Sequence, residues 1–422
     1  MPDAIAAPST TRLRAWPIVA GLVAGLVLGG GLHALHARTD TAISIAQLVG
    51  SLWLNALRIT LVPLIFSLVV TGIAAAASNR AGGQLGRRTG FLFVSLLLLS
   101  AFVGAILGSL LLDIGPAASI AAVKSSPVEV PGASAWILGL VPPNIVSAAA
   151  DGAIVPLVMF ALIFSLAAVR LGDRASQVLS LFEAIGAIMV TIVQWVLVVA
   201  PIGVFALAFS LGATTGLGAG AFVGWYVVVQ IMATLLLAAL MYPLAVKSGL
   251  SFGAFSRAAA PAQAVAASTQ SSLASLPVMV EAAGHLGLPE RSAAVVLPLA
   301  VAVFRIAAPA SIVIVTLALS RITGVELGLP QLAIVMFMAT LNTLVIAGLP
   351  NQITFFAAYA PPALAVGVPV ELLPIFLAID AIPDIFYTVT NVTADLAVTS
   401  AVSGGPQPIS TADLNRSAAA RK

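Results

Sequence analysis

The residues with most capacity for chemistry lie near the C-terminus, inside an otherwise apolar run. Asp380, Asp384, Thr388, Asn391 and Asp395 follow one another at intervals of four, four, three and four residues. That spacing places all five side chains along one face of a helix. A carboxylate at the centre of a bilayer costs about 2.5–3.5 kcal/mol on insertion scales, so three of them predict a polar interior with counter-charges.

A single cation is available in the preceding long apolar run. Arg305 is the one charged residue in the stretch 297–320, and it too must find a partner inside the protein. Asp384 and Asp395 are the candidate partners, in the bidentate geometry that a guanidinium favours. Arg58, in an earlier apolar run, is expected near an interface or subunit contact, where its long stem can reach a polar surface.

The chain that holds these residues is suited to a bilayer. Of its 422 residues 60% are hydrophobic and 8% are charged, and its mean hydropathy is +1.13. A soluble domain carries about 25% charged residues. Long apolar runs recur along the chain, and one span needs about 20 such residues. The fold class predicted is therefore an all-α polytopic membrane protein.

Composition also excludes several kinds of site. The chain has no cysteine, so it holds no disulfide scaffold, thiolate metal site or catalytic thiol. No nucleophile and base pair, metal quartet or phosphate-binding glycine loop stands out, which argues against an enzyme. The pI of about 9.6 comes from loop residues and does not indicate nucleic-acid binding.

The basic residues predict the orientation. Thirteen of the eighteen Lys and Arg residues fall on one side of the membrane if the N-terminus is cytoplasmic, three fall on the other, and two lie within apolar runs. The positive-inside rule then places both termini in the cytoplasm. Residues 1–15 form the cytoplasmic N-terminus and residues 404–422 a cytoplasmic tail.

Two apolar segments are interrupted by polar residues. Segment 251–287 contains Gln270 with five hydroxyl residues around it, and segment 329–367 contains a break at Asn342–Thr354. Non-helical backbone at membrane depth is tolerated only where protein or a water-filled cavity satisfies it. Two such segments in corresponding positions point to the binding site of a transporter. Two ordinary helices packed against neighbours are the alternative.

This order of elements resembles a known family. DAIPDIFYTVTNVTAD (380–395) is similar to the eighth-span motif of the dicarboxylate/amino acid:cation symporters, which include the glutamate and aspartate transporters. QSSLASLP (270–277) and AGLPNQ (347–352) resemble the tips of that family's two hairpins. The likeness covers residues 15–403, and the chain is identified as a divergent member.

The resemblance implies an architecture. It comprises eight transmembrane helices and two re-entrant helical hairpins, arranged as inverted repeats in a homotrimer. Residues 16–249 would be mainly the scaffold and trimerisation spans one to six. Residues 250–403 would be a transport core that moves as an elevator. Span three and part of span six are expected to belong with the transport core.

The resemblance also implies a site. Substrate contacts are expected at Ser271, Ser272, Arg305, Gly348, Pro350, Asp384, Tyr387, Thr388 and Asn391. Ion coupling is expected at Asp380, Asp384, Asn391 and Asp395, with Asn391 and Asp395 forming a degenerate sodium site. No cofactor is expected beyond Na⁺ or H⁺ as the coupling ion.

This chain departs from the family at its ion ligands. The family's seventh-span Asn-Met-Asp-Gly-Thr run falls on residues 304–308, which are Phe-Arg-Ile-Ala-Ala. The eighth-span Arg falls on Tyr387 and the hairpin-one Arg site falls on Gln270. In span three, residues 91–99 offer only Ser95. Sodium needs several oxygen ligands, so sodium coupling is not carried over.

Arg305 then has two possible roles. Either its guanidinium replaces a bound cation by pairing with Asp395 or Asp384, or it binds the carboxylate of the substrate. If sodium is not used, proton coupling through Asp380, Asp384 and Asp395 is the natural substitute, and uniport or exchange also stays open.

The sequence therefore predicts a secondary transporter of an anionic or zwitterionic organic solute, working by alternating access. It would be a multi-pass protein of the bacterial cytoplasmic (inner) membrane, with the lipid bilayer and a small molecule as partners and no nucleic acid. An anion-conducting channel-like protein and a receptor that does not transport are the alternatives.

Overall fold

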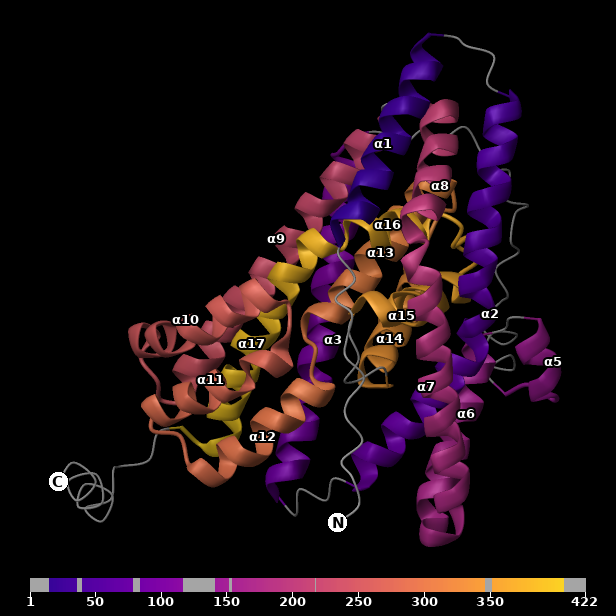
Figure 1. Cartoon of the computed structure of the whole chain (residues 1–422). Coiled ribbons are helices and arrows are strands. Elements are labelled where there is room, and N and C mark those ends of the chain that lie inside the picture. Colours follow the sequence, from indigo (N-terminus) through magenta and orange to yellow (C-terminus); the bar gives the residue numbers. More distant parts are fainter. Residues whose placement is uncertain are drawn as a thin grey trace, which may run out of the picture.

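Helices make up the fold in every part of the chain that the computed structural model describes, which is residues 15–35, 40–78, 84–116, 141–151, 154–216, 218–345 and 351–405. In Figure 1, α10, α11, α12 and α17 gather on one side, α2, α6 and α7 lie on the opposite side, and α13–α16 fill the middle. In chain order the helices are α1 (Ala15–Ala34), α2 (Asp40–Ser78), α3 (Gln84–Asp113), α5 (Ile145–Ala150), α6 (Ile154–Leu171), η1 (Gly172–Ala175), α7 (Ser176–Val198), α8 (Ala200–Thr215), α9 (Gly218–Lys247), α10 (Phe252–Thr269), α11 (Ser272–His285), α12 (Glu290–Val303), α13 (Ala307–Thr323), α14 (Leu329–Val345), α15 (Asn351–Ala365), α16 (Leu373–Ile379) and α17 (Ala381–Ser403).

Many of these helices are built to cross a membrane. Within the described residues, six helical stretches are long and apolar enough to do so, and the bent pair α16–α17 makes a seventh. One stretch, Pro156–Val198, contains both α6 and α7, joined by the 3-10 turn η1. The prediction of an all-α polytopic membrane protein is confirmed, whereas the count of eight spans and the inverted repeats stay predictions.

The first interrupted segment forms a helical hairpin. Helix α10 ends at Thr269, α11 begins at Ser272, and the two helices pack against each other. Gln270 turns the chain with a φ of 51°, the only positive φ outside glycine in the described part of the chain. The Ser271 hydroxyl accepts a hydrogen bond from the Ala274 amide at 3.2 Å and so caps α11. The polar run in the sequence is therefore the turn of this hairpin.

The second interrupted segment forms the helices α14 and α15, which also pack together. Asn342 of α14 donates from Nδ2 to the Ala358 carbonyl of α15 at 3.1 Å, which ties the two arms to each other. The predicted tip of this hairpin, with Gly348 and Pro350, lies outside the described residues.

Helices α1 and α8 meet almost backbone to backbone. Gly21, Gly25 and Gly29 recur every four residues on α1 and face α8. A Cβ on Gly25 would lie 2.6 Å from the Phe205 carbonyl oxygen, closer than real Cβ atoms approach. Small residues at this spacing allow the close approach that drives helix pairing in lipid. The pair is therefore a tightly joined unit.

Helix α2 completes this side of the molecule. The Trp53 indole packs on Gly203 of α8 and donates from Nε1 to the Val196 carbonyl of α7 at 3.0 Å. Phe66 of α2 lies with its ring centroid 5.0 Å from that of Phe182 on α7 and 6.0 Å from that of Phe160 on α6. Aromatic contacts and one indole hydrogen bond thus bind α2, α6, α7 and α8 into one packed group.

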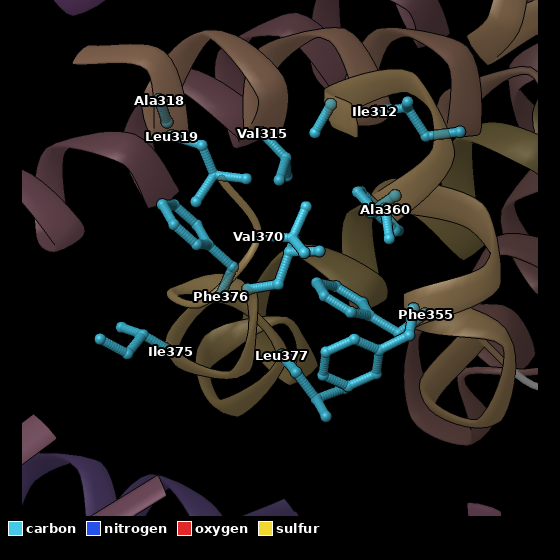
Figure 2. Packing of buried hydrophobic residues seen from close by; sticks show 14 of the residues in the cluster. Ile312, Val315, Ala318, Leu319, Phe355, Ala360, Val370, Ile375, Phe376 and Leu377 are labelled. Carbon is cyan, nitrogen blue, oxygen red and sulfur yellow. The ribbon is translucent and has the colours of Figure 1, made fainter. Parts of the chain in front are cut away.

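The middle of the molecule is an apolar core. Figure 2 shows Ile312, Val315 and Leu319 of α13 facing Phe355 of α15 and Phe376 of α16. Phe355 and Phe376 are fully buried. In a bilayer the gain comes from van der Waals packing between these side chains, because lipid tails are as apolar as leucine. This core fixes the positions of α13, α15 and α16, which carry part of the candidate site.

Helices α3 and α9 pack against this core. A Cβ on Gly104 of α3 would lie 2.6 Å from the Ala310 backbone, so α3 and α13 touch directly. On α9, the Thr234 carbonyl accepts a hydrogen bond from the Thr390 hydroxyl of α17 at 3.1 Å. Both helices therefore lie beside α13 and α17.

Candidate functional site

The site forms where two helices break inside the protein. The first break separates α12 from α13 at Phe304–Ile306, where the resemblance expects an unwound seventh span. Asn391 of α17 accepts the Ala307 amide at 3.0 Å and so caps α13 from another helix. Ser100 of α3 accepts the Ala310 amide at 3.1 Å and donates to the Ile306 carbonyl. Polar side chains of α3 and α17 thus satisfy the backbone at this break.

The second break separates α16 from α17. The chain bends there by 68°, and Asp380 is the residue between the two helices. Gln270 at the tip of hairpin one donates from Nε2 to the Ala381 carbonyl at 2.8 Å. The left-handed backbone conformation of Gln270 costs about 1–3 kcal/mol. The hydrogen bond to Ala381 helps to offset that cost. Hairpin one therefore touches the start of α17 directly.

The predicted polar face of α17 is buried throughout. Asp380 and Asp395 are 0% exposed, Asp384 is 8% exposed, and Thr388 and Asn391 are also buried. The Thr388 hydroxyl bonds to the Asp384 carbonyl of its own helix at 2.8 Å. The structure thus buries three carboxylates, two on α17 and one at its N-terminal cap.

Arg305 belongs to the Asp384 end of this face. It lies in the first break and is half-buried. Its positive charge acts on Asp384 and on Tyr359 of α15. Among the described residues no charged side chain acts on Asp395. Of the two partners that the sequence allows, the electrostatics of the site therefore favour Asp384.

Asp395 has a different environment. Neither of its carboxylate oxygens has a hydrogen-bond partner within the described residues. Even after relaxation, an isolated charge costs several kcal/mol to bury. Asp395 therefore needs a proton or a bound cation to neutralise it.

The surroundings of the first break do not fit a sodium ion. Phe304 is stacked on Phe93 of α3, with ring centroids 4.4 Å apart and an interplanar angle of 8°. The carbonyls of Arg305 and Ile306 already accept the Ala308 amide and the Ser100 hydroxyl. Asn391 caps α13, and the half-buried Ser95 bonds to its own helix at Phe91. Apart from Asp395, the side chains that supply oxygen ligands in the family are thus absent or already engaged.

The hairpin tips are only partly described. Ser271 and Ser272 lie half-buried at the tip of hairpin one, 
and the Ser271 hydroxyl serves as the cap of α11. Gly348 and Pro350 lie outside the described residues.

Tyr387 points into a cluster that the sequence did not reveal. Its hydroxyl bonds to Ser311 of α13 at 2.9 Å, and Ser311 also bonds to Tyr359 of α15 at 2.8 Å. Gln230 of α9 donates to the Tyr226 hydroxyl at 2.8 Å and to Ser311 Oγ at 3.2 Å. One sequence signal could have indicated this cluster, namely the lone polar residue Gln230 within the apolar run VVVQIM. Such a residue in a membrane span must find a polar partner inside the protein.

Comparison with known proteins shows the family of the chain. A model of the sodium:dicarboxylate symporter family matches residues 15–404. The chain is similar to a proton/glutamate-aspartate symporter of Escherichia coli (strain K12), at 25% identity over 403 residues covering 90% of each chain. It is 24% identical to a proton/sodium-glutamate symport protein of Bacillus subtilis (strain 168), covering 88% of each chain. It is 23% identical to C4-dicarboxylate transport protein 1 of Pseudomonas aeruginosa (strain UCBPP-PA14), covering 92% of this chain and 86% of the relative.

Proposed function

Because this chain belongs to the sodium:dicarboxylate symporter family, it is a secondary transporter and not an enzyme, and we propose that it carries a zwitterionic amino acid together with protons. The observation that carries the proposal is the contrast between two buried carboxylates. Asp384 shares its surroundings with the cation Arg305, and Asp395 has no charged neighbour or hydrogen bond within the described residues.

The substrate class follows from Asp384 and Arg305. An amino acid carries an ammonium and a carboxylate on one carbon, and the opposite charges of Asp384 and Arg305, which act on each other, match these two groups. A side-chain carboxylate would need a second cation. The two family positions for such a cation hold Tyr387, which bonds to Ser311, and Gln270, which bonds to the Ala381 carbonyl. A neutral side chain therefore fits this site better than an acidic one.

The coupling ion follows from Asp395. Its carboxylate is fully buried, and the stacked rings of Phe304 and Phe93 take the place of oxygen ligands. A proton neutralises a carboxylate without needing further ligands, whereas sodium requires several. Asp395 is therefore the residue that carries a coupled proton through the membrane.

The architecture proposed is that of a homotrimeric elevator. Residues 16–249 form mainly the scaffold and residues 250–403 the transport core, with both termini in the cytoplasm of a bacterium. The tightly packed group of α1, α2, α6, α7 and α8 supports a fixed scaffold. The packing of α3 and α9 on α13 and α17 supports their movement with the core.

The 422-residue chain has no cysteine, so single Ser9→Cys and Ser410→Cys variants report the side of each terminus by labelling with a membrane-impermeant maleimide.

The proposed function is tested in proteoliposomes. Uptake of labelled alanine, serine, glutamate and succinate is measured with an inward proton gradient, with an inward sodium gradient, and with neither. We expect uptake of a neutral amino acid that follows the proton gradient and ignores sodium. Uptake that requires sodium contradicts the assignment of Asp395, and uptake of succinate alone contradicts the zwitterionic substrate.

A further inference from the structure

The backbone on both sides of Arg305 is attached to helix α3. On the N-terminal side, the Phe304 ring stacks on Phe93 of α3, with centroids 4.4 Å apart and an interplanar angle of 8°. On the C-terminal side, Ser100 of α3 donates to the Ile306 carbonyl. Phe93 and Phe304 are at most 3% exposed, and Ser100 is 0% exposed. The two residues that flank Arg305 in the chain are therefore held by the same helix.

The spacing of Phe93 and Ser100 explains how one helix can hold both residues. The two are seven residues apart, about two helical turns, so their side chains lie on one face of α3. Gly104 follows on that face, and a Cβ there would lie 2.6 Å from the Ala310 backbone. The glycine thus lets α3 approach α13 closely enough for a short serine side chain to reach the backbone of α13.

Ser100 bonds to both groups of one helical turn. Its hydroxyl donates to the Ile306 carbonyl and accepts the Ala310 amide at 3.1 Å. A carbonyl and an amide four residues apart are hydrogen-bond partners in an α-helix. A side chain that enters this ladder is one of the known causes of a helix kink. The Ser100 hydroxyl therefore sets where the first turn of α13 lies relative to α3.

Pro309 explains why α13 alone does not fix Arg305. Proline has no amide hydrogen, so the Arg305 carbonyl cannot form the bond to residue 309 that would extend α13 back through Arg305. It accepts the Ala308 amide instead, at 3.0 Å. The contacts of Phe304 and Ile306 with α3 add the constraint that the helix itself does not supply.

We propose that Ser100 is a positioning residue, which holds the backbone beside Arg305 so that the guanidinium lies where it binds the carboxylate of the substrate. Ser100 is fully buried and its hydroxyl is engaged with backbone groups, so it acts through Arg305. A binding group must be held within about 0.5 Å of its productive place. This inference rests on the proposed function, in which Arg305 binds that carboxylate, and it goes beyond it by assigning the residue that places Arg305.

The position of residue 305 is tested first, without any substrate. The 422-residue chain has no cysteine, so Arg305→Cys places a single thiol at the half-buried break. The rate at which this thiol reacts with a maleimide is measured with and without Ser100→Ala. Ser320→Ala is the matched control, because Ser320 is also buried but donates to the Leu317 carbonyl of its own helix α13.

We expect Ser100→Ala to raise the labelling rate about 2- to 10-fold, the shift in a local equilibrium that loss of one typical hydrogen bond causes. The control Ser320→Ala should leave the rate unchanged. The Ile306 carbonyl and the Ala310 amide can pair with each other once the Ser100 hydroxyl is gone. The variant should therefore stay folded, and its unfolding temperature in detergent is measured alongside.

The effect on binding is measured second, as the apparent affinity for labelled alanine and serine in exchange at equal pH. We expect Ser100→Ala to weaken it roughly 3- to 10-fold, less than Arg305→Met does, because the charge remains and only its place changes. In the Arg305→Met background Ser100→Ala should weaken the affinity no further, since two changes that act through one group are not additive. A general structural defect would weaken the affinity in both backgrounds.

Three results would overturn the positioning role while the proposed function stands. These are an unchanged labelling rate at residue 305, an unchanged affinity in Ser100→Ala, and a loss of affinity that recurs in full in the Arg305→Met background. Normal affinity in Arg305→Met overturns the proposed function itself. If the wild type exchanges neither alanine nor serine, the proposed function also fails, and the labelling rate alone decides whether Ser100 holds residue 305 in place.

Discussion

Asp384 and Asp395 lie on one helix, eleven residues apart, yet they differ in almost every contact. Asp384 shares its surroundings with the fixed cation Arg305 and is 8% exposed. Asp395 is 0% exposed and has neither a charged neighbour nor a hydrogen-bonded oxygen within the described residues. The same side chain thus serves two purposes. A carboxylate with a built-in counter-charge can recognise a substrate, and one without it must take its counter-charge from solution.

Arg305→Met should have the largest effect, because it gives Asp384 the isolation of Asp395. Truncating one partner of a buried charged pair costs 2–5 kcal/mol or more. Since Arg305 is half-buried, we expect about 2–3 kcal/mol, or roughly a 30- to 150-fold weaker apparent affinity in exchange assays. Arg305→Lys keeps the charge without the planar fork and should lose less. Normal transport by Arg305→Met would contradict its role in binding.

Asp395→Asn should remove one coupled proton without altering the Asp384 end. A gradient of one pH unit corresponds to about 1.4 kcal/mol, so each proton lost lowers the accumulation ratio about tenfold. The ratio of internal to external substrate at steady state measures this directly. Exchange at equal pH is the control and should survive. An unchanged accumulation ratio would place the coupled proton elsewhere.

Asn391→Ala should loosen the region between the two carboxylates. Its side chain caps α13 at Ala307, and loss of a cap costs about 0.5–2 kcal/mol. We expect a lower unfolding temperature in detergent. Thr399→Val on the same helix removes a hydroxyl that, among the described residues, bonds to the Asp395 carbonyl of its own helix, and it should change the unfolding temperature less. Equal effects of the two substitutions would show that the cap contributes little.

Arg58→Gln should have the smallest effect and leave both carboxylates as they are. Arg58 donates to Glu371 at 2.6 Å, between α2 and the turn before α16, and both side chains are at least a third exposed. Exposed pairs contribute about 0–1 kcal/mol. Arg321→Gln removes the exposed pair with Asp113 and is the matched control. A transport defect in Arg58→Gln but not in Arg321→Gln would show that the link between α2 and α16 matters for the cycle.

The sequence predicted those parts of the fold that depend on local spacing. The polar face of α17 follows from the helical period alone, and all five of its residues are buried as expected. The turn of hairpin one follows from the polar run around Gln270, because such a run cannot continue as a buried helix. The break in the seventh span was expected at 304–308 from the resemblance and lies at Phe304–Ile306.

What depends on distant contacts could not be predicted. Ser311 and Tyr387 are 76 residues apart, and only the packing of α13 on α17 brings them together. The choice between Asp384 and Asp395 as the neighbour of Arg305 depends on how α12, α13 and α17 are placed, which no periodicity describes. Arg58 was expected near an interface or subunit contact, and its partner Glu371, 313 residues away, had no local signal.

The backbone contact between α1 and α8 has a consequence for synthesis. Gly21, Gly25 and Gly29 pack directly on α8, and the ribosome makes that partner about 170 residues later. At about 5–20 residues per second, the first helix waits in the bilayer for roughly 10–30 s. During that interval the face of α1 that carries Gly21, Gly25 and Gly29 is open to other newly inserted helices. Correct biogenesis therefore requires this face to be kept unoccupied, or to be bound only reversibly, until α8 arrives.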